Sequence, residues 1–206
     1  MEETYETGGV RGVLHRPETP GGDAIVLTHG AGSDFNAPLL ISLARGFAEA
    51  GCLVLRYDLP FRVEGRKSPP LPAAQGRDRE GIVRAVEAVR AMARGRVIAG
   101  GHSYGGRQTA MAAAEHASLA DGLLLLSYPL HPPDKPQQLR TSFFGDWHTP
   151  ALFLHGTRDP FGTIDEMKSA IQLIPARTEL IPVQGAGHDL KKAGAMAGEI
   201  LARMLF

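Results

Sequence analysis

Short apolar segments alternate with amphipathic segments along the whole chain, and this alternation most strongly constrains the fold. Residues 24–28 (AIVLT) form a continuous apolar run, which is typical of a strand buried on both faces. Leu40, Leu43 and Phe47 then recur at helical spacing. Because this order repeats to the end of the chain, the sequence predicts an α/β fold. We expect a three-layer α/β/α sandwich around a mostly parallel sheet of about seven or eight strands.

The individual elements follow from the same pattern. Strands are predicted at 4–7, 10–15, 24–28, 52–57, 96–100, 122–127, 151–155 and 178–183. The first two are expected to form a hairpin through Gly8 and Gly9. Helices are predicted at 38–51, 82–93, 105–117, 163–174 and 191–206. Asn36 is expected to cap the first of these helices and Asp189 the last, because both side chains can accept a hydrogen bond from a backbone N–H.

Length and composition limit the number of domains and the class of protein. A chain of 206 residues is too short for two ordinary domains with separate cores, so we expect residues 1–206 to form one domain. The 22 Lys and Arg residues balance the 22 Asp and Glu residues, which argues against a nucleic-acid or membrane-surface binder. The N-terminus lacks the basic and apolar segments of a signal peptide, and no apolar run is long enough for a membrane span. We therefore expect a cytoplasmic location.

One turn carries the strongest indication of chemistry. Residues 101–105 (GHSYG) follow a predicted strand and precede a predicted helix, with Ser103 at their centre. A sharp strand-to-helix turn leaves no room for side chains two residues before and after this serine, which explains the two glycines. The serine hydroxyl is then exposed at the start of a helix, where the helix dipole favours a developing negative charge. The simpler interpretation is a glycine-rich turn in which Ser103 only caps the helix, but the flanking strand and helix favour a nucleophile.

This turn resembles the nucleophile elbow of the α/β-hydrolase superfamily, in which the catalytic serine, acid and histidine follow one another in that order. The resemblance implies that Ser103 is the nucleophile, Asp159 the acid and His188 the base, since each lies just past a predicted strand. Asp189 is a competing acid. It is adjacent to His188 and can hardly reach the far nitrogen of that ring, so the resemblance favours Asp159.

The same resemblance implies an oxyanion hole, a pair of N–H groups that would bind the negative oxygen of the tetrahedral intermediate. Residues 29–32 (HGAG) follow the third predicted strand, where the family places one of these groups. The backbone N–H groups of Ala31 and Tyr104 are the expected donors. A simple glycine turn is the alternative interpretation of residues 29–32.

Other types of site receive less support from the sequence. His29, His102 and His155 lie near the ends of predicted strands and could hold a metal, but each belongs to a motif of the family, and we expect no metal site. Neither a phosphate-binding loop nor a dinucleotide fingerprint is present, so we expect no cofactor. Cys52 begins a predicted strand and is expected to be a buried apolar residue rather than a reactive thiol.

Three segments carry a narrower resemblance: residues 29–32 (HGAG), 131–136 (HPPDKP) and 155–162 (HGTRDPFG). They resemble a small subgroup typified by testis-expressed protein thirty and by the hydrolase-like domain of the third subunit of the nuclear NSL complex. The chain is also similar in size to dienelactone hydrolases. Those enzymes use a cysteine nucleophile where this chain has Ser103, so their substrate is not carried over.

Two proline-rich loops are expected to border Ser103. The loop at 59–76 carries three basic residues and the loop at 128–149 carries four ring-bearing residues: Arg62, Arg66 and Lys67, and His131, Phe143, Phe144 and Trp147. These side chains could line a pocket, with the basic ones contacting an anionic substrate. For the basic residues, a solvated loop is the favoured interpretation. The prolines at 129, 132, 133 and 136 prevent a helical insertion, so we expect no cap domain.

Together these features predict a serine hydrolase that acts on a small acyl substrate, an ester, a thioester or a related compound. Two alternatives stay open. A non-catalytic binding module could keep the fold, although such a relative usually lacks one member of the triad and all three are present here. An acyltransferase would use a bound alcohol or amine in place of water, which the sequence does not distinguish from hydrolysis. No nucleic-acid or membrane partner is expected.

Overall fold

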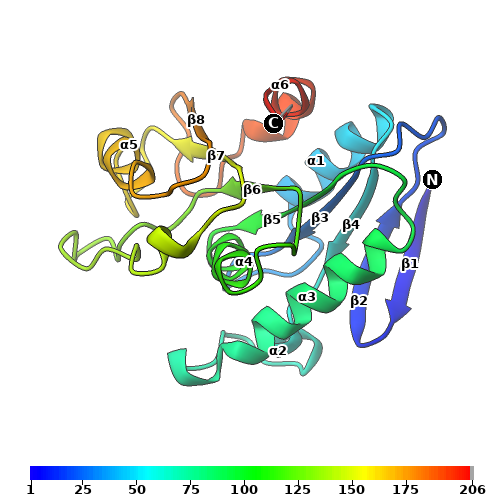
Figure 1. Ribbon diagram of the computed structural model, residues 1–206, viewed down its shortest axis with the longest axis horizontal. Helices are drawn as coiled ribbons and strands as arrows, with labels where there is room; N and C mark the ends of the chain where they lie inside the picture. Colours follow the sequence, from blue (N-terminus) through cyan, green and yellow to red (C-terminus); the bar gives the residue numbers. More distant parts are fainter. Residues whose placement is uncertain (205–206) are drawn as a thin grey trace.

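An eight-stranded sheet crosses the computed structural model, which describes residues 1–204 (Figure 1). The strand order is β1-β2-β4-β3-β5-β6-β7-β8. Strands β1 and β2 run antiparallel to their neighbours, and all pairings from β4 to β8 are parallel. The strands are β1 (Glu2–Thr7), β2 (Val10–His15), β3 (Ala24–Thr28), β4 (Leu53–Tyr57), β5 (Val97–His102), β6 (Gly122–Leu126), β7 (Ala151–Gly156) and β8 (Thr178–Val183).

Helices cover both faces of the sheet and complete three layers (Figure 1). The helices are α1 (Pro38–Glu49), α2 (Pro60–Val63), α3 (Gly76–Arg90), α4 (Tyr104–Glu115), α5 (Ile164–Ile171) and α6 (Ala197–Arg203), with 3₁₀ turns η1 (Pro72–Ala74), η2 (Phe144–Asp146) and η3 (Ala193–Met196). Helices α1 and α6 pack on one face and α3, α4 and α5 on the other. Alternate residues of β3 face the two cores: Val26 lies on the α3 side and Leu27 on the α1 side. The predicted three-layer α/β fold is therefore confirmed.

The predicted strands all occur, with small shifts at their ends. The N-terminal hairpin turns through Gly8 and Gly9, both at positive φ, which is the backbone conformation that a tight hairpin requires. The prediction that Asn36 caps α1 is wrong. Ala37 holds the cap position, and the Asn36 Oδ1 instead accepts a hydrogen bond of 3.0 Å from the buried guanidinium of Arg56. A buried charge needs acceptors more than an exposed helix end does.

The C-terminal segment also differs from its prediction. The helix expected at 191–206 is instead η3 followed by the short helix α6, and residues 205 and 206 lie outside the described part of the chain. Asp189 caps neither element; its carboxylate lies exposed, 3.2 Å from the Lys191 Nζ. Leu190 has a φ of 47°, which no α-helix accommodates, and Leu190, Ala193 and Ala197 are buried in the core beside α1.

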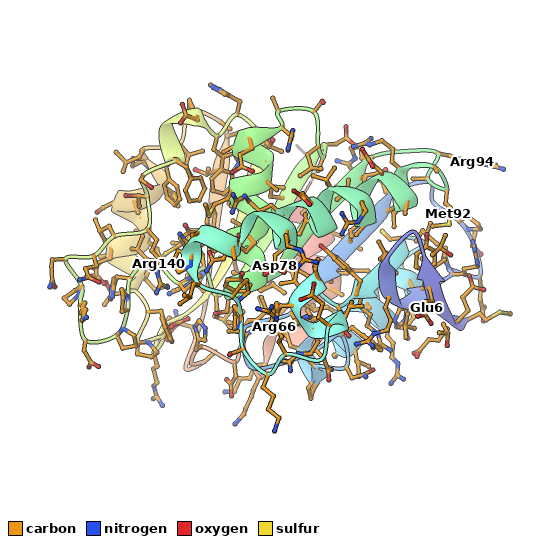
Figure 2. The ribbon with its side chains drawn as sticks, turned by 90° about the horizontal axis from the view of Figure 1, so that it is seen from below. Glu6, Arg66, Asp78, Met92, Arg94 and Arg140 are labelled. Atoms are coloured by element: carbon orange, nitrogen blue, oxygen red, sulfur yellow. The ribbon has the colours of Figure 1, made fainter. Side chains whose placement is uncertain are left out.

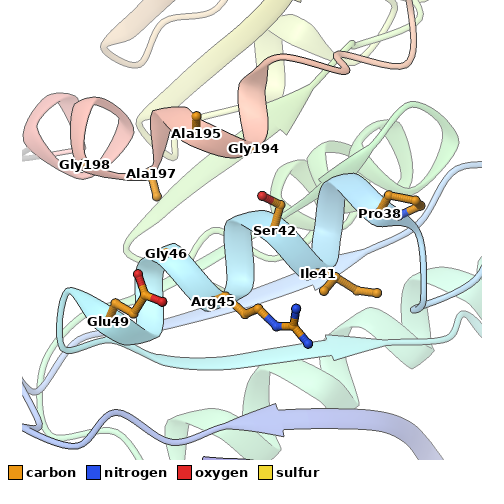
Figure 3. A pocket seen from close by; sticks show the side chains of 10 residues that line it. All are labelled: Pro38, Ile41, Ser42, Arg45, Gly46, Glu49, Gly194, Ala195, Ala197 and Gly198. Atoms are coloured by element: carbon orange, nitrogen blue, oxygen red, sulfur yellow. The ribbon is translucent and has the colours of Figure 1, made fainter.

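The segment of η3 and α6 lies along α1 with a shallow groove of about 670 Å³ between them (Figure 3). Small residues such as Gly46, Gly194 and Ala197 line this groove. None of its lining residues is a predicted member of the triad or the oxyanion hole. The groove is therefore separate from the predicted site.

The two proline-rich loops differ in their secondary structure. The segment 59–76 contains α2 and η1, which correct its prediction as an irregular loop. The segment 128–149 contains only η2, so the structure carries no helical cap domain over the sheet in residues 1–204, as predicted. Within the same described residues, no helix has the length and apolar character needed to span a membrane.

Candidate active site

The turn between β5 and α4 presents Ser103 in a strained conformation. Its φ is 51° and its ψ is −114°, a region that residues other than glycine rarely adopt. The glycines on either side are required by close packing. A Cβ on Gly101 would lie 2.8 Å from the carbonyl oxygen of Thr28, and one on Gly105 would clash with the carbonyl oxygen of His29. The local sequence therefore forces the chain to expose the serine side chain at the carboxyl end of the sheet.

Three side chains from separate loops form a continuous hydrogen-bonded chain. The Ser103 Oγ lies 2.7 Å from the His188 Nε2. On the other side of the ring, the His188 Nδ1 lies 2.8 Å from Oδ2 and 3.0 Å from Oδ1 of Asp159. With its proton on Nδ1, His188 donates to Asp159 and offers Nε2 as the acceptor for the serine proton. This arrangement is the one needed for a serine nucleophile, a base and an orienting acid.

Asp159 is held ionised although it is buried. Burial favours the neutral acid, but hydrogen bonds from His188 and from the backbone N–H of Phe161 outweigh it and keep the pKa of Asp159 below its usual value. The Phe161 ring packs against the imidazole of His188, with ring centres 4.2 Å apart. Asp159 can therefore stabilise a positive imidazole, while Phe161 limits the movement of the ring.

His102 holds the backbone of His188 in place, a role that the sequence did not indicate. Its Nε2–H donates a hydrogen bond of 2.7 Å to the carbonyl oxygen of His188, and the two rings lie 5.2 Å apart. Burial lowers the pKa of His102, so the ring is neutral and keeps one N–H for this bond. The one feature of the sequence that could have indicated this role is the position of His102 immediately before Ser103, at the end of a predicted strand.

The loop after β3 orients the backbone N–H of Ala31. The carbonyl of the same peptide group, that of Gly30, accepts hydrogen bonds from the His29 Nδ1–H at 2.8 Å and from the Ser33 N–H at 3.1 Å. Because the C=O and N–H of a trans peptide point in opposite directions, these bonds direct the Ala31 N–H away from His29. This N–H has no hydrogen-bond acceptor within residues 1–204.

The second predicted donor is fixed in a similar way. The carbonyl of Ser103 accepts a hydrogen bond of 2.9 Å from the Arg107 N–H, which sets the orientation of the peptide that carries the Tyr104 N–H. The Tyr104 hydroxyl donates a bond of 2.6 Å to Asp78, whose side chain is buried at the start of α3. Burial raises the pKa of Asp78, and this pairing ties the nucleophile turn to α3. No sequence signal pointed to Asp78, which lies before the helix predicted at 82–93.

The three histidines considered as a metal site make separate hydrogen bonds to carbonyl groups. The Nε2–H of His155 donates to the carbonyl oxygen of Gly162 at 2.7 Å, while His29 and His102 bind the carbonyls described above. No group of three or more His, Cys, Asp or Glu side chains that could hold a metal ion occurs within residues 1–204. Each of these three histidines therefore supports a loop of the candidate site.

The basic residues of the segment 59–76 divide into one that reaches the site and two that do not. The Arg62 Nη2 donates a hydrogen bond of 3.3 Å to the carbonyl oxygen of Ala31. Arg66 is exposed and pairs with Glu64 at 3.4 Å, and Lys67 is exposed as well. The structure therefore favours the solvated interpretation for Arg66 and Lys67, and places Arg62 beside the predicted oxyanion loop.

The aromatic residues of the segment 128–149 do not form a pocket wall, so that prediction is wrong. Phe144 and Trp147 are only 1% and 0% exposed, and they pack with Tyr128 and Phe153 in the core on the α4 side. Phe143 packs against this cluster and is partly buried. Burying these rings removes more apolar surface from water than lining a shallow cleft would.

Cys52 is buried, as predicted. Burial raises the pKa of its thiol to about 11, which keeps it protonated and unreactive near neutral pH.

Comparison with solved structures supports the same fold. A dienelactone hydrolase from Anabaena variabilis is 21% identical, with a TM-score of 0.75 over 98% of this chain and 95% of that one. An alpha-beta serine hydrolase homologue from Coxiella burnetii is 16% identical, with a TM-score of 0.76 over 100% and 97%. A serine hydrolase without lid from Xanthomonas campestris is 17% identical, with a TM-score of 0.76 over 98% and 94%. At these identities the likeness concerns the fold.

The sequence itself decides the family. The family model described as an alpha/beta hydrolase domain matches residues 22–203, which include β3 through α6 and every residue of the candidate site. The chain therefore belongs to the alpha/beta hydrolase family.

Proposed function

We propose that this protein is a serine hydrolase that cleaves the acyl bond of a small ester, thioester or related substrate. The observation that carries this proposal is the hydrogen bond of 2.7 Å between the Ser103 Oγ and the His188 Nε2, with Asp159 bonded to the opposite nitrogen of the same ring. A free serine is a weak nucleophile, and this geometry supplies the base that activates it.

In the proposed reaction, the Ser103 Oγ attacks the carbonyl carbon of the substrate while His188 removes its proton. Asp159 stabilises the positive imidazole. The carbonyl oxygen becomes negative and would accept hydrogen bonds from the Ala31 and Tyr104 N–H groups. His188 then gives its proton to the departing alcohol or thiol, which leaves an acyl group on Ser103. A water molecule, deprotonated by His188, then attacks the acyl carbon. The bond between this carbon and the Ser103 Oγ breaks, the acid leaves, and His188 returns the proton to Ser103.

The absence of a cap domain in residues 1–204 supports a small substrate. A long acyl chain needs an apolar channel, because each CH₂ left in water forfeits about 0.8 kcal/mol of binding free energy. The aromatic side chains that could have formed such a channel, Phe144 and Trp147, are buried in the core instead. An acyltransferase would use the same acyl-enzyme and differ only in the group that accepts the acyl.

We further propose that residues 1–206 form one domain. The cytoplasmic location and the membership of the narrower subgroup stay predictions from the sequence.

Labelling with a fluorophosphonate tests the proposal without knowledge of the substrate. The probe reacts only with a serine whose hydroxyl is activated by a base. We expect the wild type to be labelled on Ser103, and Ser103→Ala to lose both labelling and the hydrolysis of 4-nitrophenyl acetate. Ser118→Ala is the matched control, because Ser118 is exposed in the turn after α4, at the end of this helix opposite Ser103. A wild type that resists labelling would favour the non-catalytic binding module.

A further inference from the structure

The two expected oxyanion donors lie on different segments of the chain, and the sheet alone does not fix their separation. One N–H group belongs to Ala31, after β3, and the other to Tyr104, at the start of α4. Strands β3 and β5 pair only as far as Thr28 opposite Gly101, so each donor lies three residues beyond this last pair. Because both N–H groups must reach one oxygen atom, contacts outside the sheet have to hold them together.

Asp78 is a buried carboxylate that makes such contacts. Its Oδ2 accepts a hydrogen bond of 2.6 Å from the Tyr104 hydroxyl, and its Oδ1 accepts one of 3.3 Å from the backbone N–H of Phe61 on α2. Only 1% of Asp78 is exposed. Figure 2 shows Asp78 near the start of α3, with Arg94 beyond the opposite end of this helix. The carboxylate therefore joins the nucleophile turn directly to α2.

Helix α2 continues this connection to the other donor. The Arg62 Nη2 donates a hydrogen bond of 3.3 Å to the carbonyl oxygen of Ala31. The Phe61 ring packs edge-on between two other rings, with its centre 5.6 Å from that of His29 and 5.9 Å from that of Tyr104. Since His29 belongs to the loop that carries Ala31, α2 contacts both donor-bearing segments.

The buried carboxylate is costly for the fold. Both of its hydrogen bonds come from neutral donors, a hydroxyl and a backbone N–H. Burial outweighs these bonds and raises the pKa of Asp78, which means that the site disfavours the charged form. A well-packed apolar side chain of similar volume would avoid this cost. The effect of Asp78 that remains is to fix α3, α2 and the nucleophile turn relative to one another.

We propose that Asp78 is a positioning residue for the oxyanion hole. It holds the turn of Tyr104 and, through α2, the loop of Ala31, so that both N–H groups point at the same oxygen. Such donors act at about 2.7–3.1 Å from the oxyanion, so a small shift of one loop weakens one of the two bonds. Asp78 itself touches no reacting atom. This inference rests on the proposed function.

Two substrates that differ in one atom test the proposal. In 4-nitrophenyl acetate the negative charge of the intermediate develops on oxygen, whereas in its thiono analogue, with C=S in place of C=O, it develops on sulfur. Sulfur accepts hydrogen bonds more weakly than oxygen, so the thiono ester gains less from the two donors. The ratio of kcat/KM for the ester to kcat/KM for the thiono ester therefore reports the oxyanion hole. A defect in the triad or in the fold lowers both rates alike.

The variants remove the bond between Asp78 and Tyr104 in different ways. We expect the ratio to fall by about 3–10-fold in Tyr104→Phe and in Asp78→Leu, the scale of one hydrogen bond. Asp78→Asn keeps an oxygen for the Phe61 N–H and offers an N–H to the Tyr104 hydroxyl oxygen, so its ratio should stay closer to that of the wild type.

A double variant covers the case in which a single variant does not fold. Asp78→Leu/Tyr104→Phe replaces the pair by apolar side chains, and it leaves neither a buried charge nor an unpaired hydroxyl at this position. Its ratio should fall as in the single variants.

Arg79→Gln is the matched control. Arg79 also joins α3 to α4, through hydrogen bonds of 2.8 Å to Glu115 and 3.3 Å to Gln108, and neither partner belongs to a donor-bearing segment. Its ratio should equal that of the wild type. A ratio that keeps the wild-type value in folded Tyr104→Phe and in the double variant would overturn the proposal, even if both rates fall together. Failure of the proposed function looks different, because the wild type would hydrolyse neither ester and the fluorophosphonate would not react.

Discussion

His102 and His188, 86 residues apart in the sequence, are joined by a hydrogen bond of 2.7 Å from an imidazole Nε2–H to a backbone carbonyl. The residue next to the candidate nucleophile thus fixes the loop that carries the candidate base. Since Ser103 and His102 belong to the same turn, the serine and the histidine that activates it are positioned by one element.

Replacing His102 should reduce turnover without removing the triad. We expect His102→Ala to lower kcat for 4-nitrophenyl acetate by about 3–10-fold, the scale of one lost hydrogen bond, with little change in KM. His102→Gln can still donate an N–H to the His188 carbonyl and should retain more of the activity. Equal losses in both variants, with equal melting temperatures, would show that the hydrogen bond does not position the base.

The two aspartates near His188 should behave differently. Asp159→Asn should lower kcat by up to about 10⁴-fold, because the neutral amide no longer holds the His188 tautomer or stabilises its charge. Asp189→Asn is the matched control, since it removes only an exposed pair with Lys191. Its free energy of unfolding should change by less than about 1 kcal/mol and its kcat should stay close to that of the wild type. An inactive Asp189→Asn with an active Asp159→Asn would reverse the assignment.

Stability should fall in mild acid because of His15. Its Nε2 accepts a hydrogen bond of 2.8 Å from the Arg56 Nε, and burial together with the charge of Arg56 lowers its pKa to about 4. Above pH 6.5, the unfolded-state pKa, both states are neutral and the full stability is present. As the pH falls from 6.5 to about 4, the unfolded state binds a proton that the folded state does not. This residue therefore contributes a loss of at most about 1.4 kcal/mol per pH unit.

Urea unfolding at a series of pH values measures this loss. His15→Gln supplies an oxygen acceptor for Arg56 and does not titrate, so its free energy of unfolding should depend less steeply on pH between 4 and 6.5. Burial also lowers the pKa values of His29, His102 and His155, so some pH dependence should remain. Parallel curves for the variant and the wild type would contradict the assignment.

Substrate length provides a further prediction. Acetate and butyrate esters of 4-nitrophenol should be hydrolysed faster than the palmitate ester, and lipid–water interfaces should not activate the protein, because the segment 128–149 forms no helical lid. The measurement is kcat/KM as a function of acyl length. A steady rise to sixteen carbons would show a deep acyl channel.

The sequence alone determined the features that depend on local rules. Apolar runs such as Ala24–Thr28 defined the buried strands, and the glycines around Ser103 defined the sharp turn, because periodicity and backbone conformation act over a few neighbouring residues. The order of Ser103, Asp159 and His188 was also visible, since each follows a strand whose carboxyl end lies at the same edge of the sheet.

Only the tertiary structure decided which side chains meet across the fold. Trp147 lies in the core rather than in a pocket wall. His102 reaches the carbonyl of a residue on a distant loop. These outcomes depend on the competition of many side chains for the same space and the same hydrogen-bond partners. That competition is settled by packing between segments far apart in the chain, which no local pattern of residues encodes.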